Sequence, residues 1–579
     1  MREHIEQLLQ QALQQLATQH PIGTISISLE RPRDPSHGDW STAVALSLAK
    51  SLQQPPRVIA EQLLALIPSD PDIETVELAG PGFINFKLQK NYLHKQLETM
   101  WSSPNCGIQE RTQPATVVID YSSPNLAKEM HVGHLRSTII GDALARILTF
   151  LGEQVIRQNH IGDWGTQFGM LLAYMHEMQQ HSQTPFNLSD LESFYLAAKQ
   201  RFDTDADFAD AARAWVVKLQ SNDPVAQTLW HQFISLSLAH CQALYQVLGV
   251  QLQPSDAHAE SAYNAALPSI VTTLEQQGLL RDEDGTKCVF LDQFKGKDKQ
   301  PLPIIVQKKD GGFLYASTDL AAVDYRCHTL KADRILYVVD ARQSLHFQQI
   351  FALALRAGFA TPATQLEHVE FGMILNKAGK PFKSRDGGVT KLVDLLDEAQ
   401  HRAAALIAAK NPDLSEQDCR DMAKTIGIAA VKYADLSKNR ISDYVFDWDT
   451  MLSFEGNTAP YLLYANTRIH SLLRKAAVVR QALDPISFEV QDPQEIALAK
   501  HLALFPDVLV NSAHKATPHL ICTYVYELAG LFSSFYEACP ILTPDSEAHK
   551  NPRLKLAALT SKVLEKGLDL LGIPTLNRM

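Results

Sequence analysis

The feature that most constrains the fold is a strand, a short loop and a helix in direct succession near residue 120. Thr116–Asp120 has an apolar strand pattern, and residues 122–134 (SSPNLAKEMHVGH) lead into a long apolar helix pattern that Gly152 ends. In a parallel sheet, such a unit gathers backbone N–H groups and the positive end of a helix dipole. The sequence therefore predicts the first strand–helix turn of a nucleotide-binding sheet.

Two histidines stand at the predicted start of this helix, with a glycine between them. Gly133 would let an adenine ring approach the backbone, and His131 and His134 would donate to phosphate oxygens whose charge grows when the α-phosphate is attacked. One alternative is a plain helix N-terminus with two surface histidines. Another is a metal site, which has little support because no cysteine lies near.

Composition limits the classes of protein to which the chain can belong. Its 579 residues, 45% of them hydrophobic, predict several domains with their own cores. The net charge of −11 means that any nucleic-acid contact must come from local basic patches. Seven scattered cysteines without a CxxC pair indicate a reducing compartment and no zinc site. With no signal peptide and no apolar run near the ~20 residues of a membrane span, we expect a cytoplasmic protein without a membrane partner.

Several motifs resemble one enzyme family. HVGH resembles the HIGH signature of class I aminoacyl-tRNA synthetases, and SPNLAKEMHVGHLRS is similar to the form found in arginyl-tRNA synthetases. HGDW (37–40) and GPGFINF (80–86) resemble the N-terminal domain of the same family, and GDWGTQFG (162–169) also looks like it. Residues 456–470 resemble the start of its helical anticodon-binding domain.

The pattern and the resemblance together predict the architecture. The expected fold is α/β, with a doubly wound parallel (Rossmann-like) catalytic sheet, a helical insertion, a small N-terminal α/β domain and an all-α C-terminal domain. The expected domains are a tRNA-elbow-binding domain (1–110), a catalytic domain (115–390) with its insertion at about 170–310, a helical connection (391–455) and an anticodon-binding domain (456–579). Further strands are expected at 24–29, 74–78, 82–88, 154–157, 334–339 and 369–373, and a helix from about Leu345.

The resemblance also implies an arginine pocket. A guanidinium presents a planar fork of five donors, so selection against lysine requires acceptors that meet this fork. Tyr315 and Asp319 lie one helical turn apart, on one face. Asp319 would bind the guanidinium, Tyr315 would shape the pocket and Asn125 would orient the α-amino and carboxyl groups. Gln343 matches the family's glutamine, and Glu260 lies in Ala-Glu-Ser where the family usually has Gly-Glu-Ser.

The expected ATP site uses the histidine motif and a lysine-rich loop. Residues 377–388 (KAGKPFKSRDGG) occupy the place of the KMSKS loop of class I synthetases, but Pro-Phe replaces Met-Ser and the register is not unique. The alternative is a solvated basic turn. The catalytic residues expected are Lys128, His131, His134, Lys380 and Lys383. The ATP-binding residues expected are Ser122, Pro124, His131, Gly133, His134, Lys383 and Arg385.

Aromatic and basic residues predict the tRNA contacts. Tyr461, Tyr464, Arg468 and Met579 are expected to bind tRNA, because aromatic side chains among arginines suit stacking on loop bases and contacts with phosphate. Arg474, Lys475 and Arg480 extend the basic character of this segment. The alternative is a helical bundle with a solvated basic face.

The resemblance implies an arginine–tRNA ligase that uses ATP as substrate, with Mg²⁺ carried by ATP, no structural metal and bound tRNA required before arginine is activated. A monomer is the default expectation. Three alternatives stay open: a class I synthetase for another amino acid such as cysteine, a small-molecule nucleotidyltransferase, and an inactive RNA-binding relative. The missing zinc ligands weigh against the first, the helical C-terminal domain against the second and the intact motifs against the third.

Overall fold

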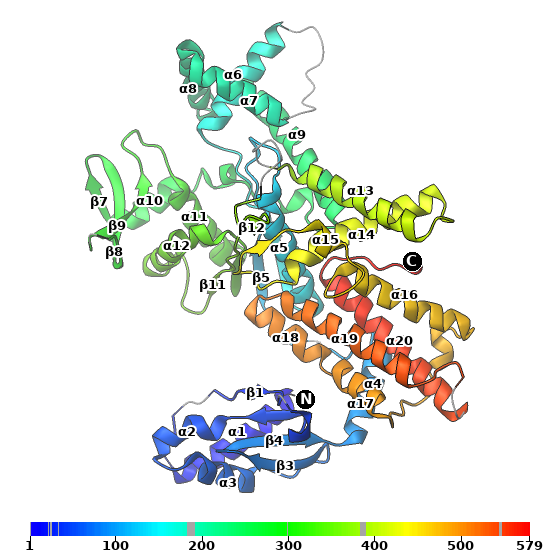
Figure 1. Cartoon of the computed structure of the whole chain (residues 1–579). Helices are drawn as coiled ribbons and strands as arrows, with labels where there is room; N and C mark the ends of the chain where they lie inside the picture. The colour runs from blue at the N-terminus through cyan, green and yellow to red at the C-terminus, as the bar shows by residue number, and fades with distance from the viewer. Residues whose placement is uncertain are drawn as a thin grey trace. The chain divides into compact units, whose positions relative to one another are not determined.

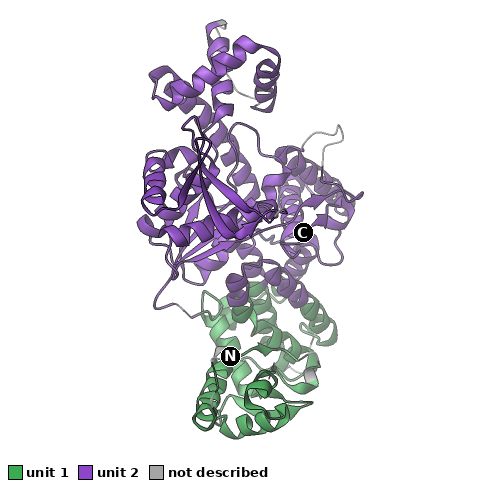
Figure 2. Cartoon of the chain, turned by 90° about the vertical axis from the view of Figure 1, so that its left-hand side faces the viewer, with its two compact units in different colours: residues 1–108, 473–508, 530–563 green, residues 109–472, 509–529, 564–579 purple. Residues whose placement is uncertain are grey.

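The structure is a computed structural model of the whole chain. It describes residues 2–20, 22–23, 26–32, 34–109, 111–181, 191–297, 299–382, 390–543 and 547–579. The chain forms two compact units (Figure 2). Unit 1 comprises residues 1–108, 473–508 and 530–563, and unit 2 comprises residues 109–472, 509–529 and 564–579.

The N-terminal part of unit 1 is a small α/β fold. Its antiparallel sheet has the order β1-β2-β4-β3, with β1 at Leu29–Glu30, β2 at Trp40–Thr42, β3 at Ile73–Ala79 and β4 at Phe83–Leu88. The helices that share its core are α1 (Arg2–Gln19), α2 (Val44–Leu52) and α3 (Pro56–Leu66). The strand expected at 24–29 is wrong for residues 26–28, which are extended but unpaired; Thr24 and Ile25 lie outside the described residues.

The two family-like motifs of this fold meet through strand pairing. Trp40 of β2 pairs with Phe86 of β4. Gly38 has a φ of +98°, and a Cβ there would lie 2.7 Å from the Phe86 carbonyl oxygen, so the turn before β2 requires glycine. Unit 1 also contains α4 (Lys90–Ser102) and α17 (Pro493–Leu502).

A four-stranded parallel sheet forms the centre of unit 2 (Figure 1). Its order is β11-β10-β5-β6, with β5 at Thr116–Asp120, β6 at Gln154–Gln158, β10 at Arg334–Tyr337 and β11 at Gln365–His368. Helix α5 (Val132–Phe150) connects β5 to β6, and α12 (Ser344–Ala357) connects β10 to β11. The order therefore reverses between β5 and β10, and this switch point is where such sheets bind ligands.

The strand expected at 369–373 is misplaced. The paired residues are Gln365–His368, and Val369 and Phe371 follow the strand as buried loop residues. Residues 369–373 continue the pairing only in part: the N–H of Val369 donates to the carbonyl of Tyr337 at 2.8 Å, and Phe371 forms an isolated parallel bridge with Asp340. The strand itself lies earlier, in an edge strand that carries polar residues.

The insertion is helical only in its first part. Its helices are α6 (Thr166–His181), α7 (Leu191–Thr204), α8 (Ala206–Gln220), α9 (Pro224–Leu248) and α10 (Leu267–Gln276). An antiparallel sheet follows, made of β7 (Leu280–Glu283), β8 (Thr286–Lys295) and β9 (Pro301–Gln307). The expectation of helix up to residue 310 is wrong here, since alternate residues of β9 such as Ile304 and Val306 enter the core that also holds Leu320.

The chain after residue 390 is almost entirely helical. Its helices are α13 (Leu392–Lys410), α14 (Glu416–Leu436), α15 (Trp448–Met451), α16 (Ala459–Lys475), α17, α18 (Phe505–Lys515), α19 (His519–Ala538) and α20 (Glu547–Leu570). A short parallel pair joins β12 (Ile374–Leu375) to β13 (Tyr444–Val445). Helix α11 (Tyr315–Asp324) precedes β10.

One stretch of the described chain, Pro493–Lys515, is long and apolar enough by length and composition to cross a membrane. A turn at residues 503–504 divides it into α17 and α18. Glu495 within it is buried and paired with Arg553 at 2.7 Å. One such stretch is weak evidence for a span, because buried helices pass the same test.

Candidate active site

The two histidines of the HVGH motif form the N-terminal cap of α5. The N–H of Gly133 donates to Nδ1 of His131, and the N–H of His131 donates to Nδ1 of His134, each at 3.0 Å. The two ring centroids lie 4.0 Å apart. A Cβ on Gly133 would lie 2.7 Å from Cε1 of His131, so glycine is needed for this ring to fold over the helix start. The structure thus adds a packing reason for Gly133 to the expected contact with adenine.

Both histidines are neutral near pH 7. Burial, together with the positive charges of Lys128 and Arg342, lowers the pKa of His131. Burial lowers the pKa of His134 to about 3. Because Nδ1 of each ring accepts a hydrogen bond, the single ring proton belongs on Nε2. The motif therefore offers two Nε2–H donors at the positive end of α5.

The loop between β5 and α5 begins with two residues in the left-handed region, Ser122 (φ 69°) and Ser123 (φ 44°). The Ser122 hydroxyl is buried and shares a hydrogen bond of 2.7 Å with the hydroxyl of Tyr245. It also accepts one from Thr138 at 2.9 Å. The Ser122 side chain therefore holds the loop in place, and its binding to ATP stays a prediction.

The next residues of this loop pair with the loop after β6. The N–H of Gly162 donates to the carbonyl of Pro124 at 3.1 Å, and the N–H of Leu126 donates to the carbonyl of Gly162 at 2.9 Å. Pro124 is buried, whereas Asn125 is exposed and accepts a hydrogen bond from the N–H of Ala127 through Oδ1. The position of Asn125 at the surface is compatible with its predicted substrate contact.

A buried ion pair supports the end of β5. Arg326 donates through Nη2 to Asp120 at 2.7 Å and through Nε to Gln158 at 2.6 Å. Although burial opposes it, the positive charge of Arg326 keeps the pKa of Asp120 below its ordinary value. Asp120 is the last residue of β5, and its other oxygen accepts from the Ser123 hydroxyl at 2.7 Å. This pair fixes the start of the loop that leads to the histidines.

Two carboxylates, Asp163 and Asp319, lie close enough to a third, Glu260, for their charges to act on it. The N–H of Glu260 donates to the carbonyl of Ile161 at 3.0 Å, which joins the Glu260 turn to the loop after β6. Burial and the negative charges of Asp163 and Asp319 raise the pKa of Glu260 to about 8. Burial raises the pKa of Asp163 as well. Carboxylates this close to one another repel when they are ionised, so a bound cation would stabilise them.

Tyr315 and Asp319 lie on α11, as the sequence predicts. Tyr315 is 68% exposed, and partial burial with the charges of Glu260 and Asp319 raises its pKa. Asp319 Oδ2 lies 2.6 Å from Nε2 of His346 on α12. The structure therefore brings Glu260, Tyr315 and Asp319 together.

Gln343 lies on the other side of the switch point. It ends the short helical turn Ala341–Gln343 that follows β10, and its side chain is exposed. The preceding residue, Arg342, pairs with Asp340 at 2.8 Å and is one of the charges that act on His131. The loop after β10 therefore brings a positive charge close enough to act on the histidine motif.

The described part of the lysine-rich loop is a hairpin, residues 374–382, which we call the lysine hairpin. Leu375 pairs with Pro381, and the N–H of Phe382 donates to the carbonyl of Ile374 at 3.0 Å. Lys380 is exposed on it. Lys383 and Arg385 lie outside the described residues.

The chain beyond this loop returns to the histidine motif. The N–H of Val132 donates to the carbonyl of Thr390, and the N–H of Leu392 donates to the carbonyl of Met130, both at 3.0 Å. Lys128 is exposed, and its Nζ lies 4.5 Å from the ring centroid of Tyr195 on α7. Its charge is still close enough to lower the pKa of His131.

Three of the four predicted tRNA contacts lie on one face of α16. Tyr461, Tyr464 and Arg468 are three and four residues apart, and Tyr464 is 51% exposed. Met579 is partly exposed. Arg480 does not extend this face: it lies in unit 1, with its guanidinium 4.6 Å from the ring centroid of Trp101.

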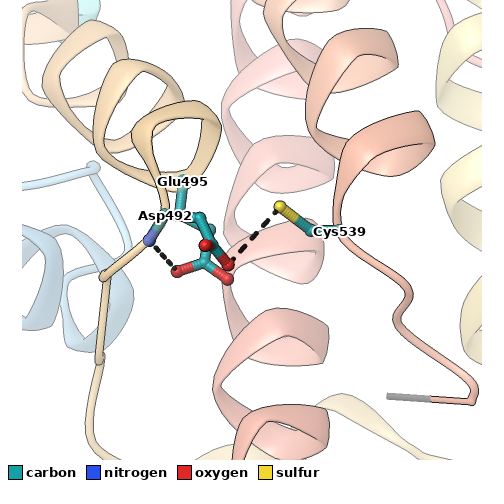
Figure 3. A group of neighbouring side chains, drawn as sticks. All are labelled: Asp492, Glu495 and Cys539. Atoms are coloured by element: carbon teal, nitrogen blue, oxygen red, sulfur yellow. Dashed lines mark hydrogen bonds between the residues drawn. The ribbon is translucent and has the colours of Figure 1, made fainter. Parts of the chain in front are cut away.

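A separate group of possible metal ligands lies in unit 1, where Asp492, Glu495 and Cys539 offer atoms within 4.8 Å of one another (Figure 3). Arg553 pairs with Asp492 at 2.6 Å and with Glu495 at 2.7 Å. The Asp492 N–H also donates to Glu495, which caps α17. The guanidinium already balances both carboxylates, so the group is explained as an ion-paired helix cap.

We call the group of Asp163, Glu260, Tyr315, Asp319 and His346, at the expected arginine site, the acidic pocket; the sequence does not predict two of them, Asp163 and His346. Asp163 was visible in GDWGTQFG without an assigned role, and His346 stands three residues after Gln343. Their partners are far away in the chain: Asp163 contacts Ser261, and His346 contacts Asp319. The only available signal was a charged residue between two glycines and a histidine in the first turn of a helix.

Comparison with known proteins decides the family. Three family models match in order: "Arginyl tRNA synthetase N terminal domain" (residues 3–88), "tRNA synthetases class I (R), catalytic domain" (97–448) and "DALR anticodon binding domain" (462–579). The chain is 55% identical to the arginine–tRNA ligase of Idiomarina loihiensis, over all of both chains. This chain belongs to the arginyl-tRNA synthetase family.

Solved structures of arginyl-tRNA synthetases agree with this assignment. The Plasmodium falciparum enzyme has a TM-score of 0.86 at 29% identity, covering 100% of this chain and 99% of that one. The Thermus thermophilus enzyme has a TM-score of 0.81 at 25% identity, covering all of both chains. The fold class predicted from the sequence is confirmed. HGDW, GPGFINF, HVGH and GDWGTQFG lie within the matched regions, and the segment 456–470 overlaps the anticodon-binding match from residue 462.

Proposed function

We propose that this arginine–tRNA ligase binds arginine in the acidic pocket and activates it beside the paired histidines. The observation that carries the proposal is the gathering of Asp163, Glu260 and Asp319 next to the loop that leads to His131. Two carboxylates can meet the guanidinium fork, which the single ammonium of lysine matches less well. Tyr315 borders this pocket, and Asn125 and Gln343 would contact the amino-acid end.

In the first step the arginine carboxylate attacks the α-phosphorus of ATP, and pyrophosphate leaves. Charge grows on the phosphate oxygens, where the Nε2–H donors of His131 and His134 stabilise it. Ser122, Pro124 and Gly133 would line the ATP site. Lys128 and a lysine of the 377–388 loop (Lys380 or Lys383, with Arg385) would balance the leaving pyrophosphate. Mg²⁺ would arrive with ATP, whose phosphates supply most of its ligands.

In the second step a hydroxyl of the terminal ribose of tRNA attacks the arginyl carbonyl, and AMP leaves. No covalent enzyme intermediate is needed, so the site works by positioning and charge stabilisation. Tyr461, Tyr464, Arg468 and Met579 would hold the tRNA. A cytoplasmic monomer without a structural metal is the simplest state for this activity.

Arginine-dependent exchange between ATP and labelled pyrophosphate tests this proposal, with and without the cognate tRNA. We expect negligible exchange by the protein alone and full exchange with tRNA, since the end of the tRNA would complete the site. Lys128→Ala should lower the tRNA-dependent exchange at least about tenfold. Exchange without tRNA would show that tRNA is not needed for activation. A fully active Lys128→Ala enzyme would show that Lys128 does not balance the leaving pyrophosphate.

A further inference from the structure

Arg136 is a buried cation two residues after His134. It is 1% exposed, and its Nε lies 3.1 Å from Oδ2 of Asp435, which is also 1% exposed and belongs to α14. Nη1 donates to the carbonyl of Ser442 at 3.1 Å. A single guanidinium thus joins α5 to α14 and to the segment that follows α14.

Two aromatic rings complete the surroundings of Arg136. Its guanidinium carbon lies 5.8 Å from the ring centroid of Phe371 and 5.3 Å from that of Tyr444. Phe371 precedes β12, and Tyr444 begins β13. The guanidinium therefore contacts two segments: the residues just before the lysine hairpin, and β13, the strand that pairs with the first residues of the hairpin. We call these two segments the base of the lysine hairpin.

These two segments are tightly joined to each other. The N–H of Gly372 donates to the carbonyl of Arg440 at 2.9 Å, and the N–H of Met373 donates to Asp443 at 2.6 Å. A Cβ on Gly372 would lie 2.8 Å from the backbone nitrogen of Asp443, so the approach requires glycine. Movement of the segment after α14 would therefore move the base of the lysine hairpin as well.

We propose that Arg136 is a positioning residue that fixes the base of the lysine hairpin against the helix that carries His131 and His134. It would act through Ser442 and the two rings, and does not itself touch substrate. As a consequence, the lysines of the hairpin and the two histidines would be held at fixed positions around the triphosphate of one ATP molecule. The proposal rests on the proposed function, because it assigns both groups to ATP.

The chemistry of the pair favours positioning over simple stabilisation. A buried ion pair stabilises a fold no better than well-packed apolar residues of similar size. Arginine offers something that such residues lack, a planar fork that meets a carboxylate, a carbonyl and two ring faces at once. Arg136 meets the carboxylate through Nε and the carbonyl through Nη1, and its buried Nη2 has no hydrogen-bond partner among the described residues. These contacts and the two rings come from two separate segments of the chain.

The test separates positioning from stability by removing both charges. Arg136→Met alone would leave Asp435 buried without its cation, so the main variant is Arg136→Met/Asp435→Leu. The control is Arg334→Met/Glu367→Leu, which removes an ion pair of 2.6 Å between the first residue of β10 and the third residue of β11. The measurements are the melting temperature, the Kd for arginine, and kcat and KM for ATP in pyrophosphate exchange with cognate tRNA.

The main variant should melt near the wild-type temperature and bind arginine normally, with kcat for exchange at least tenfold lower or KM for ATP at least tenfold higher. The control should keep both constants within about twofold. A folded main variant with wild-type exchange would overturn the proposal. If the main variant does not fold, Arg136→Lys replaces it in the test, because lysine keeps a positive charge beside Asp435 without the planar guanidinium. Wild-type exchange by Arg136→Lys would also overturn the proposal. Failure of the wild-type protein to charge tRNA would refute the proposed function instead.

Discussion

Asp163 accepts two hydrogen bonds from Ser261, one from its N–H at 2.9 Å and one from its hydroxyl at 2.5 Å. Ser261 follows Glu260, so the buried aspartate fixes the turn that presents Glu260 to the pocket. The carbonyl of Asp163 is held in turn by the indole N–H of Trp230 at 2.9 Å. We therefore expect Asp163 to contribute to the selection of arginine by holding the turn that carries Glu260.

Removing this support should weaken arginine binding selectively. In Ser261→Ala one of the two hydrogen bonds is lost, and we expect KM for arginine to rise several-fold, in line with about 1 kcal/mol for a hydrogen bond. Asp163→Ala removes both and should raise it further. KM for ATP should not change in Ser261→Ala, as measured by pyrophosphate exchange with tRNA. An equal change in both KM values would show general damage to the site.

Arginine affinity should depend on pH through Glu260. Burial and neighbouring carboxylates raise its pKa to about 8 in the empty pocket, so at pH 7 the carboxyl is mostly protonated. Bound guanidinium favours the carboxylate, and binding at neutral pH must therefore release a proton. KM for arginine should fall roughly tenfold between pH 7 and pH 9.

Glu260→Gln is the control for this titration, because its amide keeps the size of the side chain and does not ionise. Its KM for arginine should be higher and should vary little over the same pH range. Calorimetry in buffers of different ionisation enthalpy measures the released proton directly. A KM that is flat with pH in the wild-type enzyme would contradict the role of Glu260.

Loss of one histidine donor should affect chemistry and not arginine binding. We expect His134→Ala to slow adenylate formation about 100- to 1,000-fold, as for one donor to a charged transition state. The measurements are single-turnover adenylate formation with tRNA present and arginine affinity by equilibrium binding. His401→Ala, an exposed histidine on α13, is the matched control and should behave as wild type. Weak arginine binding with normal turnover of the bound substrate would mean that His134 has another role.

Contacts with tRNA are best tested at the exposed ring of Tyr464. Deleting residues 456–579 would be ambiguous, because the Gly572 carbonyl accepts a hydrogen bond from buried Lys432 at 2.6 Å. Tyr464→Ala should raise the Kd for tRNA by the equivalent of roughly 1–3 kcal/mol, the usual worth of one stacked base. Affinity of the intact enzyme should fall with salt. Filter binding at two salt concentrations gives both results, and unchanged affinity in the variant would remove Tyr464 from the interface.

The sequence predicts the local features of the site well. Thr116–Asp120 and the helix after His131 form the expected turn, because apolar period and a capping residue determine both. Tyr315 and Asp319 share a helix face because their spacing is one turn. These features depend on neighbours within a few residues, which a single sequence shows.

Features that depend on tertiary contacts were not predictable. The partners Asp163 and Ser261 are 98 residues apart, and Arg136 and Asp435 are 299 apart. The sequence does not predict β8 and β9 because short apolar runs fit a buried helix as well as a strand, and it does not predict β7 because this strand is mostly charged. The sequence places the strand at 369–373 instead of 365–368 because the buried residues just after an edge strand are more apolar than the strand itself.

We propose that Asp319, a carboxylate on α11, selects arginine for attachment to tRNA. The most direct measurement is the charging of cognate tRNA with labelled arginine by the wild-type enzyme, Asp319→Ala and Asp324→Ala, over a range of arginine concentrations. Asp324 lies on the same helix and pairs with exposed His328 at 2.8 Å, which makes it the matched control. Loss of Asp319 should cost roughly 3–5 kcal/mol of arginine binding, so kcat/KM should fall at least about 100-fold, while Asp324→Ala charges tRNA as wild type. Wild-type kcat/KM for arginine in Asp319→Ala would contradict the account.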